Sequence, residues 1–250
     1  MFDLTDRVVL VTGGGRGIGR AISLELARAG ASVVVGYLDD SESALATVND
    51  ILNLRSEALA IAADLRRAAD VERLLAEAHE WRGQLHGLVA NAGIFDGRPT
   101  DSVDESGRAE VLETDLVGTI RLVREAVPYL LQHPDASVVL ISSILASHPV
   151  AGGAAYQAAK AGVEQLTRSF ALEFAPKVRF NGIAPGFIRT EMNRSGWEDP
   201  AFHRVVEERT PLCRWGEPED IAPTVRYLLA RESAWVTGTL IPIDGGASIS

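Results

Sequence analysis

The chain of 250 residues has little of what several protein classes depend on. It contains one cysteine, Cys213, which excludes an intramolecular disulfide and argues against a cysteine-based metal site. Its formal net charge is −10, and no lysine- or arginine-rich run is present. Because phosphate neutralisation by a basic patch dominates binding to duplex nucleic acid, we expect no nucleic-acid partner.

Long apolar runs are also missing. No stretch approaches the ~20 consecutive apolar residues that cross a bilayer, and the first residues lack the charged and apolar regions of a secretory signal. The five histidines show no metal-ligand spacing. We therefore expect a cytoplasmic protein with no membrane segment and no metal site.

The composition, with 46% hydrophobic and 23% charged residues, is typical of a globular protein. Short apolar runs alternate with helical patterns along the whole chain. The expected strands are 8–11, 33–35, 58–62, 88–90, 138–141, 178–183 and 240–243. The expected helices are a first one ending at 29, then 41–54, 68–81, 104–131, 154–174, about 200–209 and one from 218, with bends at Pro128 and Pro223.

Strands that are apolar on both faces predict a parallel sheet with helices on both sides. Right-handed crossovers make such a sheet a doubly wound α/β fold of the Rossmann type. No linker, internal repeat or low-complexity segment interrupts the pattern. We therefore expect residues 1–250 to form one domain around a mostly parallel, seven-stranded sheet.

A glycine-rich turn, TGGGRGIG at 12–19, lies between the first expected strand and the first expected helix. Glycines allow the backbone to turn sharply and to approach a pyrophosphate, and the helix N-terminus offers amide donors and a positive dipole end. A glycine pattern alone is weak, but its place between strand and helix at the start of the chain favours dinucleotide binding.

Further motifs follow in a fixed order: NAG at 91–93, YQAAK at 156–160, PGFIRT at 185–190 and GTLIPIDGG at 238–246. Together with the turn at 12–19, they resemble the short-chain dehydrogenase/reductase family, and the resemblance covers the whole chain. It is greatest to the subgroup that contains 3-oxoacyl-[acyl-carrier-protein] reductases and related ketoreductases. The spacing of the turn, TGxxxGxG, differs from the commoner GxGxxG.

Tyr156 and Lys160 lie four residues apart on an expected helix, so they share one face. A phenol is a weak acid–base catalyst at neutral pH because its reference pKa is ~10, and a nearby ammonium favours the phenolate. Such a tyrosine can exchange a proton with a carbonyl or alcohol oxygen. The resemblance assigns the catalytic serine to Ser143, whose hydroxyl would hydrogen-bond the substrate oxygen. Ser142 is expected to face the other way.

Asp115 departs from the family pattern. The resemblance places an asparagine there, which helps to order a water that links the lysine to a proton relay. An ionised aspartate accepts hydrogen bonds but cannot donate them, and it can also pair with Lys160 and weaken the effect of Lys160 on Tyr156. Two alternatives stay open: the relay tolerates the aspartate, which we favour, or the enzyme is slow.

The resemblance also implies a set of residues that contact a nicotinamide dinucleotide. They are Gly13, Gly15, Arg16, Gly17, Ile18, Gly19, Tyr37, Leu38, Asp64, Leu65, Asn91, Ala92, Gly93, Tyr156, Lys160, Pro185, Gly186, Ile188 and Thr190. In this set Lys160 would hold the nicotinamide ribose, Ile188 and Thr190 would contact the nicotinamide amide, and Asp64 would meet the adenine. Taken alone, Asp64 is equally well explained as a helix cap.

The choice between NAD and NADP depends on the end of the second strand. Relatives that prefer NAD place an acidic residue where this chain has Tyr37, and relatives that prefer NADP often place arginine where it has Leu38. Asp39 and Asp40 would repel a 2′-phosphate, whereas Arg16 would attract one. We favour NADP(H).

The resemblance implies a reversible oxidoreductase that passes hydride between NAD(P)H and a ketone or secondary alcohol, with a substrate lid at about 189–216. A 3-oxoacyl thioester or polyketide-type ketone is the first candidate substrate, by resemblance only. A catalytically weak NAD(P)-binding or scaffold protein is the alternative from another class, and Asp115 is its support. Sugar-nucleotide epimerases and enoyl reductases fit the glycine pattern, the length or the Tyr–Lys spacing less well.

The expected assembly is a homotetramer. The helix 154–174 carries small and apolar residues, Ala158, Ala161, Gly162, Leu166 and Phe170, and the last strand, 240–243, offers an open edge. Two self-complementary surfaces, each used about its own two-fold axis, produce a dimer of dimers. The resemblance implies the same arrangement.

Overall fold

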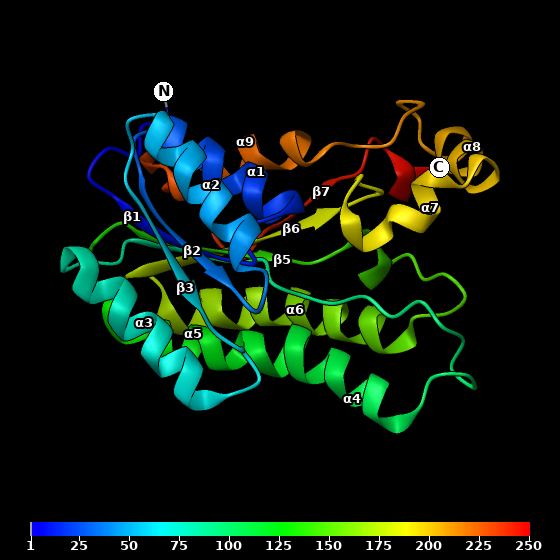
Figure 1. Cartoon of the computed structure of the whole chain (residues 1–250), viewed down its shortest axis with the longest axis horizontal. Helices are drawn as coiled ribbons and strands as arrows, with labels where there is room; N and C mark the ends of the chain where they lie inside the picture. Colours follow the sequence, from blue (N-terminus) through cyan, green and yellow to red (C-terminus); the bar gives the residue numbers. More distant parts are fainter. Residues whose placement is uncertain (1) are drawn as a thin grey trace.

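The computed structural model describes residues 2–250, which form a parallel sheet between two layers of helices (Figure 1). The strands are β1 (Val8–Thr12), β2 (Ser32–Tyr37), β3 (Ala58–Ala62), β4 (Gly87–Ala90), β5 (Ala136–Ile141), β6 (Val178–Pro185) and β7 (Leu240–Ile243). All neighbouring strands pair in parallel, in the order β3-β2-β1-β4-β5-β6-β7. The doubly wound α/β prediction is therefore confirmed, with every strand of the sheet parallel.

The helices cover both faces of the sheet, as Figure 1 shows. The longer ones are α1 (Gly17–Arg28), α2 (Ser41–Asn53), α3 (Ala68–Arg82), α4 (Glu105–Leu112), α5 (Gly118–Leu130), α6 (Ala154–Phe174), α8 (Pro200–Arg209) and α9 (Pro218–Leu229). Helices α1, α2 and α9 lie on one face, and α3, α5 and α6 lie on the other. Short helical turns at 144–146, 191–193, 231–233 and 247–249 and helix α7 (Arg194–Glu198) complete the chain.

Alternation along the strands divides the core into two halves. Val9 and Val11 of β1 belong to the apolar cluster under α1 and α9, whereas Val8 and Leu10 belong to the cluster under α3, α5 and α6. Successive side chains of a strand point to opposite faces, so a strand covered on both sides must be apolar throughout. This explains why the sequence pattern is a continuous apolar run.

The expected long helix at 104–131 is interrupted at a place the sequence did not indicate. Between α4 and α5, residues Glu113–Val117 form one π-helical turn. Helix α5 continues through Pro128 to Leu130, and α9 continues through Pro223 to Leu229, so neither proline ends its helix. The bends expected at Pro128 and Pro223 stay predictions, and the widened turn lies about three turns before Pro128.

Strand order reverses between β1 and β4, because β2 and β3 continue from one side of β1 and β4 to β7 from the other. Such a reversal leaves a crevice beyond the carboxyl ends of the strands, where ligands bind in open α/β sheets. The loops after β1, β4, β5 and β6 all leave the sheet at this edge. Within residues 2–250, no helix combines the length and the apolar character needed to cross a membrane.

Candidate active site

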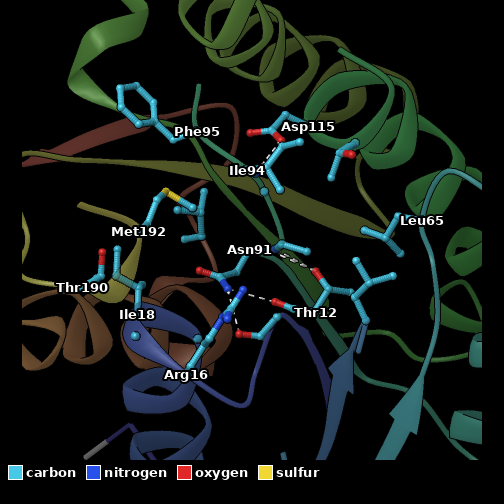
Figure 2. Close-up of a pocket in the computed structure, with 18 of the residues that line it drawn as sticks. Thr12, Arg16, Ile18, Leu65, Asn91, Ile94, Phe95, Asp115, Thr190 and Met192 are labelled. Carbon is cyan, nitrogen blue, oxygen red and sulfur yellow. Dashed lines mark hydrogen bonds between the residues drawn. The ribbon is translucent and has the colours of Figure 1, made fainter. Parts of the chain in front are cut away.

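A cleft of about 540 Å³ opens at this carboxyl edge. Every residue predicted above as catalytic or cofactor-binding lines it, and Figure 2 shows part of this lining around Asn91 and Asp115. The structure therefore brings residues from positions 12 to 193 into one space.

The glycine-rich turn forms one wall of the cleft. Gly13 has φ +62°, a value that L side chains rarely adopt, and a Cβ on Gly19 would collide with the carbonyl oxygen of Gly13. The first turn of α1 carries no acidic residue, and within the described chain its N-cap residue, Arg16, makes no capping hydrogen bond. The amide groups of this helix end are thus available to an anion, and the cradle fits a dinucleotide pyrophosphate.

Asn91 fixes the turn from the opposite side. Its Nδ2 donates to the carbonyl oxygens of Thr12, at 2.9 Å, and Gly13, at 3.3 Å. Its backbone N–H donates to Oγ1 of Thr12 at 3.1 Å (Figure 2). The loop after β4 therefore holds the loop after β1 in place, which explains why an asparagine stands at this position.

The two serines that follow β5 have different partners. Oγ of Ser142 donates to the carbonyl oxygen of Lys160 at 3.0 Å, inside the protein. Oγ of Ser143 accepts a hydrogen bond from the amide of Leu145 at 3.2 Å and lines the cleft. Because its hydroxyl hydrogen remains available to a substrate oxygen, Ser143 suits the proposed role better than its neighbour.

Helix α6 presents Tyr156 and Lys160 to the cleft from consecutive turns. Lys160 Nζ lies 5.4 Å from the centroid of the Tyr156 ring. The Phe95 ring packs edge-on against the same tyrosine, with ring centroids 5.1 Å apart. The tyrosine ring thus has both an ammonium and an aromatic ring as close neighbours.

Lys160 and Asp115 form a buried ion pair. Asp115 Oδ2 lies 3.1 Å from Lys160 Nζ, and Nζ also donates to the carbonyl oxygen of Ile141 at 3.2 Å. Burial alone would lower the pKa of the Lys160 ammonium, but attraction to Asp115, with a contribution from Tyr156, outweighs it and raises that pKa. Oδ2 makes no well-aligned hydrogen bond within the described chain, so the attraction between the two groups is mainly electrostatic.

The predicted adenine end of the cleft carries a network that the sequence did not reveal. Arg66 makes a bidentate contact with Asp64, at 2.8–3.1 Å, and reaches Glu110 at 2.6 Å. Hydrogen bonding from Arg66 holds the pKa of the Asp64 carboxyl below its usual range, so this carboxyl stays ionised. Glu110 lies 44 positions along the chain from Arg66, and only the fold brings the two together.

Arg16 and Asp40 face each other beside the end of β2. Arg16 Nη1 lies 4.0 Å from Asp40 Oδ2, and both side chains are substantially exposed. The Asp40 carboxylate also accepts a hydrogen bond from the amide of Ser43 and so caps α2, which lowers the pKa of Asp40. An exposed pair at this distance is weak and leaves Arg16 free to turn toward an anion.

The expected lid, 189–216, contains α7, α8 and the aromatic residues that support them. Thr190 and Asn193 form a capping box, and Trp197 Nε1 donates to the carbonyl oxygen of Thr190 at 3.0 Å. Trp215 is buried among aromatic rings from the lid and from the loop after β6. The segment 189–216 is therefore ordered by hydrogen bonds within it.

Sequence reasoning missed part of the lining. Ile94 and Phe95, next to the NAG motif, were missed. Together with Met192, an apolar residue of the expected lid, they give the catalytic end of the cleft an apolar side (Figure 2). Their place directly beside motif residues was the available signal. Among residues 2–250, no group of three or more histidine, cysteine, aspartate or glutamate residues is arranged to hold a metal ion.

Known proteins resemble this chain over nearly its whole length. A family model described as "Enoyl-(Acyl carrier protein) reductase" matches residues 13–248. The 3-oxoacyl-[acyl-carrier-protein] reductase FabG of Staphylococcus epidermidis is 34% identical over 242 residues, which is 96% of this chain and 98% of the relative.

Solved structures agree with this assignment. A putative gluconate dehydrogenase from Agrobacterium tumefaciens has a TM-score of 0.95 and 33% identity, and the match covers 100% of this chain and 98% of that one. RhlG of Pseudomonas aeruginosa, solved as an active-site complex with NADP, has a TM-score of 0.93 and 33% identity, and the match covers 99% and 98%. The chain therefore belongs to the short-chain dehydrogenase/reductase family and is an NAD(P)-dependent oxidoreductase that acts on CH–OH and C=O groups.

Proposed function

We propose that this protein reduces a ketone to a secondary alcohol with NADPH. The observation that carries the proposal is the convergence of Ser143, Tyr156 and Lys160 on the cleft that also contains the glycine-rich turn. These three residues come from two elements, the end of β5 and helix α6, that pack directly on each other. In this proposal the reacting carbonyl binds between Ser143 and Tyr156.

In this proposal each side chain has a separate role. Ser143 donates a hydrogen bond to the carbonyl oxygen and stabilises the charge that develops there. Tyr156 gives its phenolic proton to the same oxygen during reduction and takes it back during oxidation. Lys160 supports the tyrosine electrostatically and binds the nicotinamide ribose. A bound nicotinamide supplies or accepts the hydride.

The apolar side of the cleft favours one class of substrate. Ile94, Phe95 and Met192 line the catalytic end, and the Phe95 and Tyr156 rings pack in a T-shaped pair. This surface suits an acyl chain attached to the ketone, so a 3-oxoacyl thioester or a polyketide-type ketone is our first candidate. The relatives point in more than one direction, because one is a 3-oxoacyl-[acyl-carrier-protein] reductase and another is described as a gluconate dehydrogenase.

We infer a preference for NADP(H) from the charges near the end of β2. The residue that ends this strand is Tyr37, so this position lacks the carboxylate that would bind the ribose hydroxyls. Arg16 lines the same region, together with Asp39 and Asp40. Asp40 is engaged as the cap of α2. The structural relative RhlG, which was solved in complex with NADP, supports the same choice.

Replacing Tyr156 by phenylalanine tests the proposed function. Tyr156→Phe should lower the turnover of ketone reduction by at least ~10²-fold, the usual contribution of general acid catalysis, and should leave cofactor affinity nearly unchanged. Turnover is measured by NADPH and NADH oxidation with a panel of 3-oxoacyl thioesters, sugars and small ketones. Tyr227→Phe, on α9 and in contact with Phe2, is the matched control. Turnover by Tyr156→Phe close to that of the control would refute the assignment.

We also propose that the protein works in the cytoplasm as a homotetramer. Part of the expected helix stripe is used inside the monomer, because Leu166 and Phe170 pack on the core. Exposed Ala158, Ala161 and Leu172 remain on α6, and β7 is an edge strand. Light scattering should give roughly 107 kDa, the mass of four 26.8 kDa chains. A monomer mass would contradict both surfaces, and a dimer mass would leave one.

A further inference from the structure

The Asp115–Lys160 pair places a negative charge inside the catalytic centre. Asp115 has no exposed surface and Lys160 is only 4% exposed, so water screens their interaction little. The buried ammonium of Lys160, which lies near Tyr156, therefore has the opposite charge of the Asp115 carboxylate at 3.1 Å. We propose that Asp115 is a positioning residue that extends the proton-donating range of Tyr156 to higher pH by offsetting the charge of Lys160. This inference rests on the proposed roles of Tyr156 and Lys160.

The fold holds Asp115 firmly in this position. Asp115 belongs to the π-helical turn Glu113–Val117, and its Oδ1 accepts a hydrogen bond from the amide of Ile94 at 2.8 Å (Figure 2). A Cβ on Gly93 would lie 2.7 Å from Asp115 Oδ2 and 3.2 Å from Lys160 Nζ. The glycine of the NAG motif thus makes room for the ion pair, and any side chain there would separate the two charges.

Other charged groups near the site are engaged elsewhere. Glu113, on the same π-helical turn, lies 3.9 Å from Arg121, and Glu110, on α4, pairs with Arg66. Glu164, one turn beyond Lys160 on α6, faces Arg168, His148 and Ser142, and burial raises its pKa.

The groups that act on Lys160 are therefore few. Within residues 2–250, the carboxylate of Asp115 and the hydroxyl of Tyr156 are the titratable groups that influence the charge of this lysine. Asp115 is accordingly the carboxylate whose removal changes the field at the catalytic centre.

The expected consequence concerns the direction of catalysis. An uncompensated ammonium beside a phenol favours loss of the phenolic proton, whereas a neutral ion pair favours it much less. Reduction needs a tyrosine that still carries its proton, and oxidation needs one that has lost it. The pair therefore suits an enzyme that reduces ketones over a wide range of pH.

Asp115→Asn is the direct test, because asparagine keeps the shape of the side chain and an oxygen for the Ile94 amide but removes the charge. The ratio kcat/KM for ketone reduction is measured with saturating NADPH from about pH 6 to about pH 10.5. The alkaline limb of this profile should move to lower pH by about one unit, the size that removal of a nearby charge produces. Near neutral pH, turnover should change by less than about tenfold.

Two carboxylate variants separate charge from structure. Glu113→Gln removes a charge from the same π-helical turn without touching Lys160, so its pH profile should match that of the unmodified protein. Asp115→Glu keeps a carboxylate, so its alkaline limb should lie nearer to that of the unmodified protein than the limb of Asp115→Asn does. An unmoved limb in Asp115→Asn would overturn the proposal.

A larger loss would also be decisive. A fall of more than ~10²-fold in turnover at every pH would assign Asp115 a chemical role of its own and would overturn the proposal. If Asp115→Asn does not fold, Asp115→Ser removes the same charge and is measured in the same way. If neither variant folds while Glu113→Gln does, the role of Asp115 is purely structural and the proposal is overturned. Full activity of Tyr156→Phe would refute the proposed function itself, whereas an inactive Tyr156→Phe with an unmoved Asp115→Asn limb would refute only this inference.

Discussion

Buried polar groups have opposite uses at the two ends of the strands: the amino edge, where the strands begin, and the carboxyl edge, where they end. At the amino edge, Arg7 donates to the carbonyl oxygens of Asp135 and Leu229, and Arg179 donates to those of Leu228, Ala230 and Val236. At the carboxyl edge, the groups after β1, β5 and β6 border a cleft. One edge therefore uses its side chains to complete backbone hydrogen bonds, and the other keeps donors and charges available to a ligand.

The geometry of parallel strands explains this division. Each crossover returns the chain through a helix whose N-terminus lies at the carboxyl edge, so amide donors and positive dipole ends gather there. The amino edge collects helix C-termini and their carbonyl oxygens, which arginine side chains satisfy. A charge at the carboxyl edge is thus expected to change function, and one at the amino edge to change stability.

Replacing Arg16 at the carboxyl edge should have the larger of the two effects that test this comparison between the edges. Arg16→Ala should raise the KM for NADPH about tenfold or more and the KM for NADH much less, because a charge-assisted contact with a 2′-phosphate contributes ~1–3 kcal/mol. Steady-state kinetics with both cofactors measures the difference. Arg20→Ala, which removes an arginine of α1 that pairs with Asp50, is the control. Equal changes with both cofactors would remove the case for NADP and would make Arg16 an ordinary surface residue.

His86 at the amino edge gives the smaller effect, on stability. Burial, together with the charges of His133 and Arg7, lowers the pKa of His86 from 6.5 to about 4. Between these values the unfolded chain binds a proton that the folded chain does not, so acidification below about pH 6.5 favours unfolding. Because His86 is only half-buried, we expect a loss of about 1 kcal/mol between about pH 7.5 and about pH 5.5.

Urea unfolding of His86→Asn at the two pH values tests this expectation. Asparagine cannot titrate, yet it offers an acceptor to the amide of Val8, which donates to His86 Nδ1 at 3.1 Å. The variant should lose about 1 kcal/mol less on acidification than the unmodified protein, with turnover per folded molecule unchanged. His148→Asn, at an exposed position, should behave like the unmodified protein. The same pH slope in His86→Asn would place the acid sensitivity elsewhere.

Local pattern was enough to predict most of the fold, whereas the resemblance to a known family was needed to predict the lining of the cleft. The strand runs could be found because a strand covered on both faces must be apolar at every position, as Val8 to Val11 are. Most site residues could be found because their motifs resemble those of the short-chain dehydrogenase/reductase family. The fold then brings Gly13, Asn91 and Ser143 together, because the carboxyl ends of parallel strands meet at one edge.

Contacts that depend on distant partners could not be predicted in the same way. The Arg66 side chain donates hydrogen bonds to Asp64, two residues away, and to Glu110, 44 residues away. Nothing near Arg66 in the sequence indicates the second partner. The π-helical turn was missed for a related reason. Its residues, 113–117, have ordinary helical character and include no proline or glycine, so no local signal marks the widened turn.

The π-helical turn also fixes how far α4 is rotated about the helix axis relative to α5. Each residue of an α-helix advances the chain by about 100° around the axis, and a π-helical turn adds one residue to a turn without adding a full α-helical step of translation. Deleting one residue within 113–117 would therefore let α4 and α5 merge into a continuous helix, with everything before the deletion rotated by roughly a quarter of a circle. The single additional residue thus sets the angle between the two helices. With it, α4 contacts α6 and Asp115 still lies beside Lys160.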